Sequence, residues 1–279
     1  RNISPWNQQQ TESIATTGLD IQHFNVNDAC AETKSCVLNV AETGDINSVN
    51  NVPITIANSL YDRYVYGPAG YAGGGGSLEE LDPRTLTYFN ALATSITSSA
   101  DHLDWTVKFI PHTWHSSAKV TADDYVFTYM SDLRADVGCV CIGTLQTLLG
   151  LKAQFTFLNG TTRYVDNGTY FATEPAGWTP DSTFKAADET TFTFHIPSAY
   201  VFADPILTGG SALPMHILEK IPASQWATSF WSTLQKTPTT VTWDQNKYGG
   251  NGSYAWAYGP VGDGPYAYKG YDTVAGVGT

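Results

Sequence analysis

Three histidines around one loop carry the first candidate chemistry. His112 and His115 flank Trp114, and His102 lies a short distance before them. Imidazole nitrogens are common ligands of zinc and other transition metals. No third ligand stands at a spacing that defines a metal site, so we expect no metal and no cofactor here.

Two adjacent carboxylates, Asp123 and Asp124, form the second candidate, because paired carboxylates act as acid and base in glycosidases. Adjacent residues of a helix point in different directions, however, which disfavours joint catalysis. Thr121 followed by Asp124 has the spacing of a capping box, and both acids favour the positive end of a helix dipole. His216, in Leu-Pro-Met-His, is interpreted as an anchor of a helix start. Without a Gly-x-Ser-x-Gly elbow or a Cys/His nucleophile arrangement, the sequence predicts no enzyme.

Cysteines and glycosylation sequons indicate the compartment. The cysteines fall in two close pairs: Cys30, Cys36, Cys139 and Cys141. Neither pair has the C-x-x-C spacing of a zinc site, so disulfides in an oxidising compartment are favoured, with three pairings open. Candidate glycosylation sites are Asn2, Asn159, Asn167 and Asn251.

The candidate residues depend on a strand, a loop and a helix between residues 103 and 133. Leu103, Trp105, Val107 and Phe109 alternate with polar residues, as in a half-buried strand. After the loop, apolar residues at helical spacing predict one apolar helix face, with members Tyr125, Val126, Tyr129, Met130 and Leu133.

Other elements are predicted from local signals. Residues 153–172 contain two Asn-Gly turns between alternating segments, a strong signal for a three-stranded meander. Strands are also predicted at residues 19–26, 36–41 and 190–196. Helices are predicted to start at Pro53, and over 199–207, 215–221 and 224–234. The run of four glycines at 73–76 lacks a phosphate-binding context and is interpreted as a surface loop.

Composition excludes several classes of protein. The chain has 279 residues, of which 42% are hydrophobic and only 14% charged, with a net charge of −12. Phosphate binding needs clustered Lys and Arg, so nucleic acid is not an expected partner. No apolar stretch approaches the 18 residues of a membrane span. Because the chain begins at Arg1, we expect a processed precursor that is extracellular or at the cell surface, anchored through a segment outside this chain.

Four segments, in order, resemble one protein family. They are NNVPITIANSLYDRYV, WTVKFIPHTWHSSAKVTADDYVFTY, DETTFTFHIPSAYVFADPILTGGSALPMHILEKI and GPVGDGPYAYKGY. Together they resemble the extracellular solute-binding proteins of family 5, the oligopeptide/dipeptide-binding type that serves ABC importers. The last segment departs from the family pattern, since Asp263 stands where Thr is usual.

The resemblance implies an α/β fold, the first lobe of a periplasmic-binding-protein-like protein (type II, cluster C). It implies a mixed sheet with flanking helices and a β-hairpin-rich subdomain, and no second lobe in this chain. The implied organisation is a flexible lead at 1–18 and a lobe at 19–279. Within the lobe, 19–66 and 188–279 form a core subdomain, and 67–187 are inserted into it.

The implied function is capture of an oligopeptide, or of an oligosaccharide, by closure of two lobes. The implied partners are an ABC permease and the second lobe of the same protein. By motif offset, the resemblance places ligand contacts at Asn47, Ser48, Val49, Val140 and Cys141. Trp114 is added because aromatic rings in loops make good ligand walls.

A second class of function stays open. Low charge, many Thr residues, sequons and the missing second lobe are also typical of a structural cell-surface or filament protein built on a solute-binding lobe.

Overall fold

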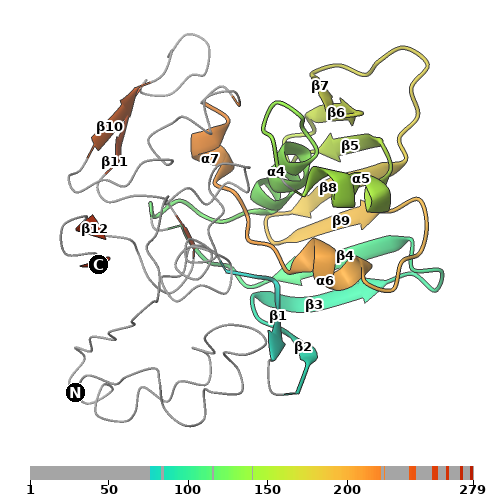
Figure 1. Cartoon of the computed structure of the whole chain (residues 1–279), viewed down its shortest axis with the longest axis horizontal. Coiled ribbons are helices and arrows are strands. Elements are labelled where there is room, and N and C mark those ends of the chain that lie inside the picture. Colours follow the sequence, from blue (N-terminus) through green and yellow to red (C-terminus); the bar gives the residue numbers. More distant parts are fainter. Residues whose placement is uncertain are drawn as a thin grey trace.

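The computed structural model describes residues 76–82, 85–114, 116–139, 141–220, 223 and 262–263, together with four short strands nearer the C-terminus. The described residues are organised around a mixed sheet of seven strands in the order β3-β4-β9-β8-β5-β6-β7 (Figure 1). β5 and β8 run parallel, and the other neighbouring pairs are antiparallel. The strands are β3 (Ala93–Ser98), β4 (Asp104–Phe109), β5 (Lys152–Thr156), β6 (Thr162–Asp166), β7 (Thr169–Phe171), β8 (Ser182–Asp188) and β9 (Thr191–His195).

The local signals for this sheet are confirmed in part. β4 has Val107 and Phe109 buried, as its alternation predicts, and the meander forms as β5, β6 and β7. In the turn between β6 and β7, Asn167 and Gly168 both have positive φ, which Asn and Gly tolerate best. β8 was not predicted, although Phe184 and Ala186 alternate with the exposed Lys185.

Helix α4 (Ala122–Asp132) crosses one face of the sheet and packs on β5, β8 and β9. The rings of Tyr129 and Phe184 stack 4.7 Å apart, and those of Tyr125 and Phe192 5.3 Å apart. The sequence predicts one apolar face for this helix, and the structure shows that residues outside that face are buried as well. Nine residues of the helix are buried, including polar Asp124, Thr128 and Ser131, because further segments cover it.

The predicted capping of α4 is confirmed. Thr121 is the N-cap, and its backbone N–H donates to Asp124 Oδ2 at 2.8 Å, within a capping box. The acidic pair therefore begins the helix, as the sequence predicts.

Three shorter helices lie near α4. α5 (Ile142–Leu149) follows the second cysteine pair, and its helical form was not predicted. α6 (Ala203–Thr208) is shorter than the predicted helix, and α7 (Met215–Leu218) begins after Pro214 as predicted. No helix among the described residues has the length and hydrophobicity that a membrane span requires.

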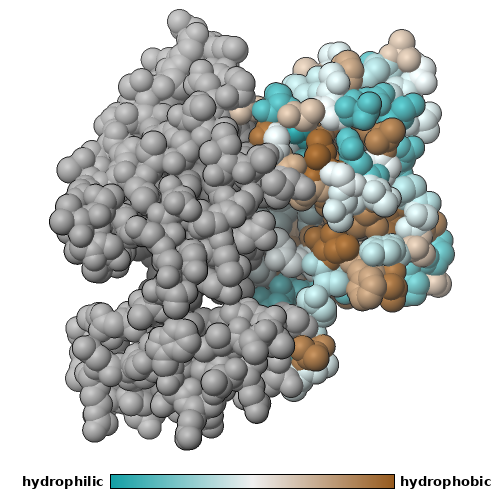
Figure 2. Space-filling model, viewed as in Figure 1, coloured by the Kyte–Doolittle hydropathy of each residue, from teal (hydrophilic) through white to brown (hydrophobic). Residues whose placement is uncertain are grey.

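Small two-stranded ladders complete the described elements. They are β1 (Glu79–Asp82) with β2 (Thr87–Asn90), β10 (Thr239–Thr242) with β11 (Ser253–Trp256), and β12 (Tyr271–Asp272) with β13 (Val277–Gly278). Figure 2 shows hydrophobic residues gathered on the viewed face at the position of α6. Just before that helix, Tyr200, Val201 and Phe202 are exposed, Val201 to 83%.

Several predictions lie outside the described residues. These are the lead at 1–18, the elements expected between 19 and 66, the pair Cys30 and Cys36, the sequons at Asn2 and Asn251, and the helix at 224–234. The division into subdomains stays a prediction. β9 lies beyond the boundary expected at residue 188, yet it pairs with β4 and β8 inside the one sheet.

Candidate functional site

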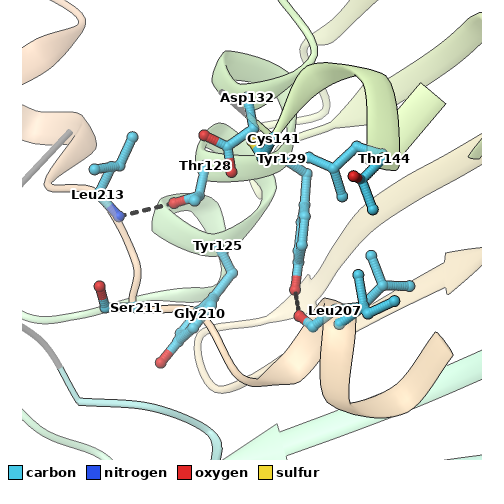
Figure 3. A pocket seen from close by; sticks show the side chains of 12 residues that line it. Tyr125, Thr128, Tyr129, Asp132, Cys141, Thr144, Leu207, Gly210, Ser211 and Leu213 are labelled. Atoms are coloured by element: carbon cyan, nitrogen blue, oxygen red, sulfur yellow. Dashed lines mark hydrogen bonds between the residues drawn. The ribbon is translucent and has the colours of Figure 1, made fainter. Parts of the chain in front are cut away.

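A cavity of about 270 Å³ lies between α4, α5, α6 and the chain that follows α6 (Figure 3). Its lining combines aromatic and aliphatic side chains with one carboxylate. The lining residues are Tyr125, Thr128, Tyr129, Asp132, Cys141, Thr144, Leu145, Ile206, Leu207, Gly210, Ser211 and Leu213.

Helix α4 supplies the cavity's polar wall. Tyr125, Tyr129 and Asp132 follow one another at spacings of four and three residues, which places them along one side of a helix. Tyr125 and Tyr129 also pack on the sheet, so their rings are held in place from behind. Asp132, at the last turn, has no such packing partner among the rings that the structure describes.

Helix α5 supplies the opposite wall through its first turns. Cys139 and Cys141 are joined in a disulfide, and the Cys141 N–H lies 3.1 Å from Cys139 Sγ. Cys141 is the N-cap of α5, so the bridge constrains the turn from which that helix begins. Of the two predicted ligand-contact residues that the structure describes, Trp114 and Cys141, Cys141 lines the cavity.

The third wall is tied to α4 by hydrogen bonds. The Tyr129 hydroxyl donates to the carbonyl oxygen of Leu207. The Leu213 N–H donates to Thr128 Oγ1 at 2.7 Å, and the Met215 N–H donates to Asp124 Oδ1 at 2.9 Å. Three residues in two successive turns of α4 thus fix the path of the chain from α6 to α7.

Burial changes the acidity of the α4 carboxyl groups. Removal from water raises the pKa of Asp132 to about 7. Burial also raises the pKa of Asp124, to about 6, although hydrogen bonds from Thr121 and Met215 act in the opposite direction. Among the described residues, no hydrogen bond reaches the buried Oδ1 of Asp132.

The nearby guanidinium of Arg134 is engaged elsewhere. It donates to Asp136 through Nε at 2.9 Å and through Nη2 at 2.7 Å. Its Cζ lies 4.6 Å from the centre of the Tyr170 ring, a cation–π contact. The guanidinium of Arg134 thus contacts Asp136 and Tyr170, whereas the carboxylate of Asp132, two positions earlier in the sequence, lines the cavity.

His115 lies outside the described residues, and the other candidate histidines have structural partners. His112 Nδ1 lies 2.7 Å from the Ile110 carbonyl oxygen, and its Nε2 lies 3.0 Å from Asp263 Oδ2. Ser98 Oγ lies 2.9 Å from His102 Nδ1, and Ser116 Oγ lies 3.0 Å from His216 Nε2. Burial lowers the pKa of His216 to about 4, so it is neutral at neutral pH.

One group of potential metal ligands occurs among the described residues, and it contains none of these histidines. Asp132, Cys139 and Cys141 bring their ligand atoms within 4.8 Å of one another. Metal ions bind thiolates, and the two sulfurs are bonded to each other instead. The group therefore contains one carboxylate, that of Asp132, and a disulfide in place of two thiolates.

Trp114 is not the accessible ring that its loop position suggested. Its side chain is 2% exposed and its ring lies 6.2 Å from that of His216, so it is a core residue and not the wall of an open site. Asn47, Ser48, Val49 and Val140 lie outside the described residues. Sequence reasoning missed Asp132 and Tyr129 as cavity residues. The sequence signal for them was the spacing of Tyr125, Tyr129 and Asp132, which places an acid and two tyrosines on one side of a helix.

Comparisons with known proteins agree with this fold. The family model described as bacterial extracellular solute-binding proteins, family 5 Middle, matches residues 87–277. AppA from Bacillus subtilis, solved with a nonapeptide, is 17% identical with a TM-score of 0.51, and the match covers 84% of this chain and 33% of AppA. A search of curated proteins gave no match.

Two further solved structures are similar over comparable shares. NikZ from Campylobacter jejuni, in complex with Ni(L-His), is 15% identical with a TM-score of 0.49, over 82% of this chain and 32% of NikZ. OppA from Haemophilus influenzae, in complex with RPPGFSPFR, is 17% identical with a TM-score of 0.48, over 81% of this chain and 34% of OppA.

The chain spans about a third of the length of the solved structures that it matches. This share fits a single periplasmic-binding-protein-like lobe, which is the fold class that the sequence motifs implied. The family model covers more than half of the chain. The chain therefore belongs to the bacterial extracellular solute-binding proteins of family 5, which are binding proteins and not enzymes.

Proposed function

We propose that this chain is the first-lobe portion of the extracytoplasmic substrate-binding component of an ABC importer, with oligopeptides as its ligands. The observation that carries the proposal is the family match over residues 87–277. The AppA structure that shares its fold was solved with a nonapeptide. An oligosaccharide is the second ligand class, as the sequence motifs leave open.

The proposed mechanism is capture by closure. A ligand that contacts this lobe and a second lobe at once binds the closed arrangement more tightly than the open one. It therefore shifts the protein toward the closed arrangement. The closed protein then delivers the ligand, chemically unchanged, to a membrane permease. The contacts proposed on this lobe are Asn47, Ser48, Val49, Val140 and Cys141, and Cys141 supports the set because it lines the cavity.

The proposal is tested by thermal shift of the purified full-length protein with pools of five- to nine-residue peptides, and separately with oligosaccharide pools. Saturating peptide at a hundred times its Kd raises the free energy of unfolding by about 2.7 kcal/mol, a clear shift. A shift with oligosaccharides alone would replace the ligand class, and no shift with either pool would overturn the proposal.

A structural surface protein is the second candidate, and the exposed Tyr200, Val201 and Phe202 favour it. Contiguous exposed apolar side chains often mark protein interfaces. Light scattering separates the two functions: a polymer that dissolves on Val201→Asp supports the structural role, and a peptide-binding monomer excludes it.

A further inference from the structure

Two of the glycosylation sequons lie in turns between the adjacent strands β5, β6 and β7 (Figure 1), and the proposed function uses neither. Asn159 stands in the turn between β5 and β6, and Asn167 in the turn between β6 and β7. Both side chains are exposed. Each asparagine is followed by Gly and Thr, so the sequence motif does not distinguish the two sites, whereas their surroundings do.

The turn between β5 and β6 leaves its sequon open to solvent. Gly160 is exposed, and a Cβ added there meets no atom within 4 Å. The Gly160 N–H donates to the Phe157 carbonyl oxygen at 2.9 Å, and the Thr161 N–H donates to Asn159 Oδ1 at 2.8 Å. These bonds are local to the turn, and among the described residues none uses Asn159 Nδ2. An enzyme can therefore bind and bend this sequon without disturbing the core.

The turn between β6 and β7 is packed against other parts of the chain. Gly168 is buried, and a Cβ added there would lie 2.9 Å from Ala135 Cβ. The Gly168 carbonyl oxygen accepts the Ala135 N–H at 2.9 Å, and the Asn167 N–H donates to the Leu151 carbonyl oxygen at 2.8 Å. The first two residues of this sequon are thus held by the segments that follow α5 and α4. An enzyme reaches their backbone only after these contacts open.

Transfer of a glycan to asparagine requires such access. The transferase recognises the asparagine amide together with the hydroxyl two positions later, so it has to bind all three residues of the sequon. In the reaction, Nδ2 forms a bond to the anomeric carbon of the first sugar and gives up one proton to a base. The polyprenyl phosphate or diphosphate that carried the sugar leaves with the electron pair of the broken C–O bond. Proteins of this extracellular family fold on the side of the membrane where such sugars are transferred.

We propose that Asn159 carries an N-linked glycan that is added to the folded protein, and that Asn167 is not modified. The inference goes beyond the proposed function and does not rest on it, because it involves no ligand contact.

The position of this glycan leaves the cavity open. The Leu158 N–H donates to Asp123 Oδ1 at 2.8 Å, which ties the turn to the first residues of α4. Asp123 and Tyr125 are two positions apart, which corresponds to about 200° around a helix axis. The side chain of Asp123 therefore leaves α4 on the side away from Tyr125, which lines the cavity.

Glycopeptide mass spectrometry of the protein purified from the cells that produce it tests the proposal. Trypsin cuts after lysine and arginine, so residues 153–163 form a peptide with Asn159 alone, and residues 164–185 form one with Asn167 alone. We expect a glycan on the first peptide in most molecules and none on the second. An unmodified first peptide, or glycans on both, would overturn the proposal.

Variants produced in the same cells locate the glycan, which is measured on the peptide 153–163. Asn159→Gln and Thr161→Ala each destroy the first sequon and should abolish the glycan, while Thr161→Ser keeps the hydroxyl and should retain it. Thr169→Ala is the matched control, because it destroys the second sequon and leaves Asn167 in its turn. It should not change the modification. A glycan that persists in Thr161→Ala, or disappears in Thr169→Ala, would contradict the assignment.

The role of packing is tested by presenting both sequons without the fold. Synthetic peptides of residues 153–163 and 164–185 are incubated with membranes of the same cells, which contain the transferase and its lipid-linked sugar. We expect both peptides to accept a glycan, because Ala135 no longer covers Gly168. Acceptance by the first peptide and refusal by the second would overturn the packing argument, since the sequence around the second sequon would then be the cause.

Discussion

At the scale of single residues, the polar side chains of α4 act as anchors for distant parts of the chain. Asp123 Oδ1 accepts the N–H of Leu158 at 2.8 Å, in the turn between β5 and β6. Asp124 Oδ1 accepts the N–H of Met215, while its Oδ2 accepts that of Thr121. The acidic pair therefore begins the helix and also joins it to two other segments.

Replacement of Asp124 by alanine should lower the free energy of unfolding by about 2–4 kcal/mol. The variant loses the capping box and leaves two backbone N–H groups without an acceptor, one of them at the start of α7. Chemical denaturation measures the change. Glu189→Ala is the control, because its ion pair with Lys119 is exposed and should contribute less than about 0.5 kcal/mol. Equal losses in the two variants would contradict the anchor role.

The pH dependence of stability should report the buried Asp132. Its pKa is raised from 3.8 to about 7, so between these values the folded protein holds a proton that the unfolded chain releases. Stability from this group is therefore greatest at low pH and falls as pH rises from about 4 to about 7. Asp132→Asn cannot lose a proton, so the variant should gain stability relative to the wild type across this window, by up to about 4 kcal/mol. Urea denaturation at several pH values measures the difference, which should be constant if Asp132 has an ordinary pKa.

Features of α4 whose cause lies within a few residues were predicted from the sequence, and features that depend on distant residues were not. The capping by Thr121 and Asp124 was predicted because both partners lie within one helical turn. The bonds to Leu158 and Met215 were not, because these residues are 35 and 91 positions from their carboxylates. The burial of Trp114 was not predicted for the same reason, since His216, far along the chain, lies beside its ring.

At the scale of elements, the hairpins were the most predictable part of the fold. Asn-Gly turns specify β5, β6 and β7 through their own backbone preferences. β8 was not predicted because its parallel partner β5 is separated from it in the sequence by β6 and β7, so no turn signal indicates this pairing. The cavity could not be predicted, since its walls come from α4, α5 and α6, and only packing brings these helices together.

The two Asn-Gly turns should respond differently to substitution. Gly160 and Gly168 have φ of 80° and 81°, so alanine is strained at both and should cost about 1–2 kcal/mol. Only at Gly168 does an added Cβ also meet a neighbour, Ala135 Cβ at 2.9 Å. Gly168→Ala should therefore lower the free energy of unfolding by more than Gly160→Ala, as measured by chemical denaturation. Equal losses would mean that Ala135 moves aside freely.

At the scale of the whole molecule, Asp263 joins residues far apart in the sequence. Its side chain is fully buried, with Oδ2 3.0 Å from His112 Nε2 and Oδ1 accepting the N–H of Gly76 at 2.8 Å. Burial alone would lower the pKa of His112, but the hydrogen bonds to Asp263 and Ile110 outweigh it and raise that pKa. The acid at this position, where the family motif usually has Thr, thus has a structural reason.

Asp263→Ala should lower the free energy of unfolding by about 3 kcal/mol, because it leaves the half-buried His112 and the Gly76 N–H without their acceptor. Thermal denaturation measures the loss. Asp104→Ala, which removes an exposed carboxylate from a pair with His195, should change stability by less than about 0.5 kcal/mol. A loss in Asp263→Ala no larger than in this control would contradict the role of the buried pair.

The anchors on α4 also have a consequence for how the protein is made. Met215 follows Asp124 by 91 positions, and Leu207 follows Tyr129 by 78. At about 5–20 residues per second, a ribosome adds Met215 about 5–18 s after Asp124. During that interval the helix has been synthesised, and the segments that complete its surroundings have not. A nascent chain halted before residue 207 should therefore present the tyrosines of α4 to chaperones, and one extended past residue 215 should not.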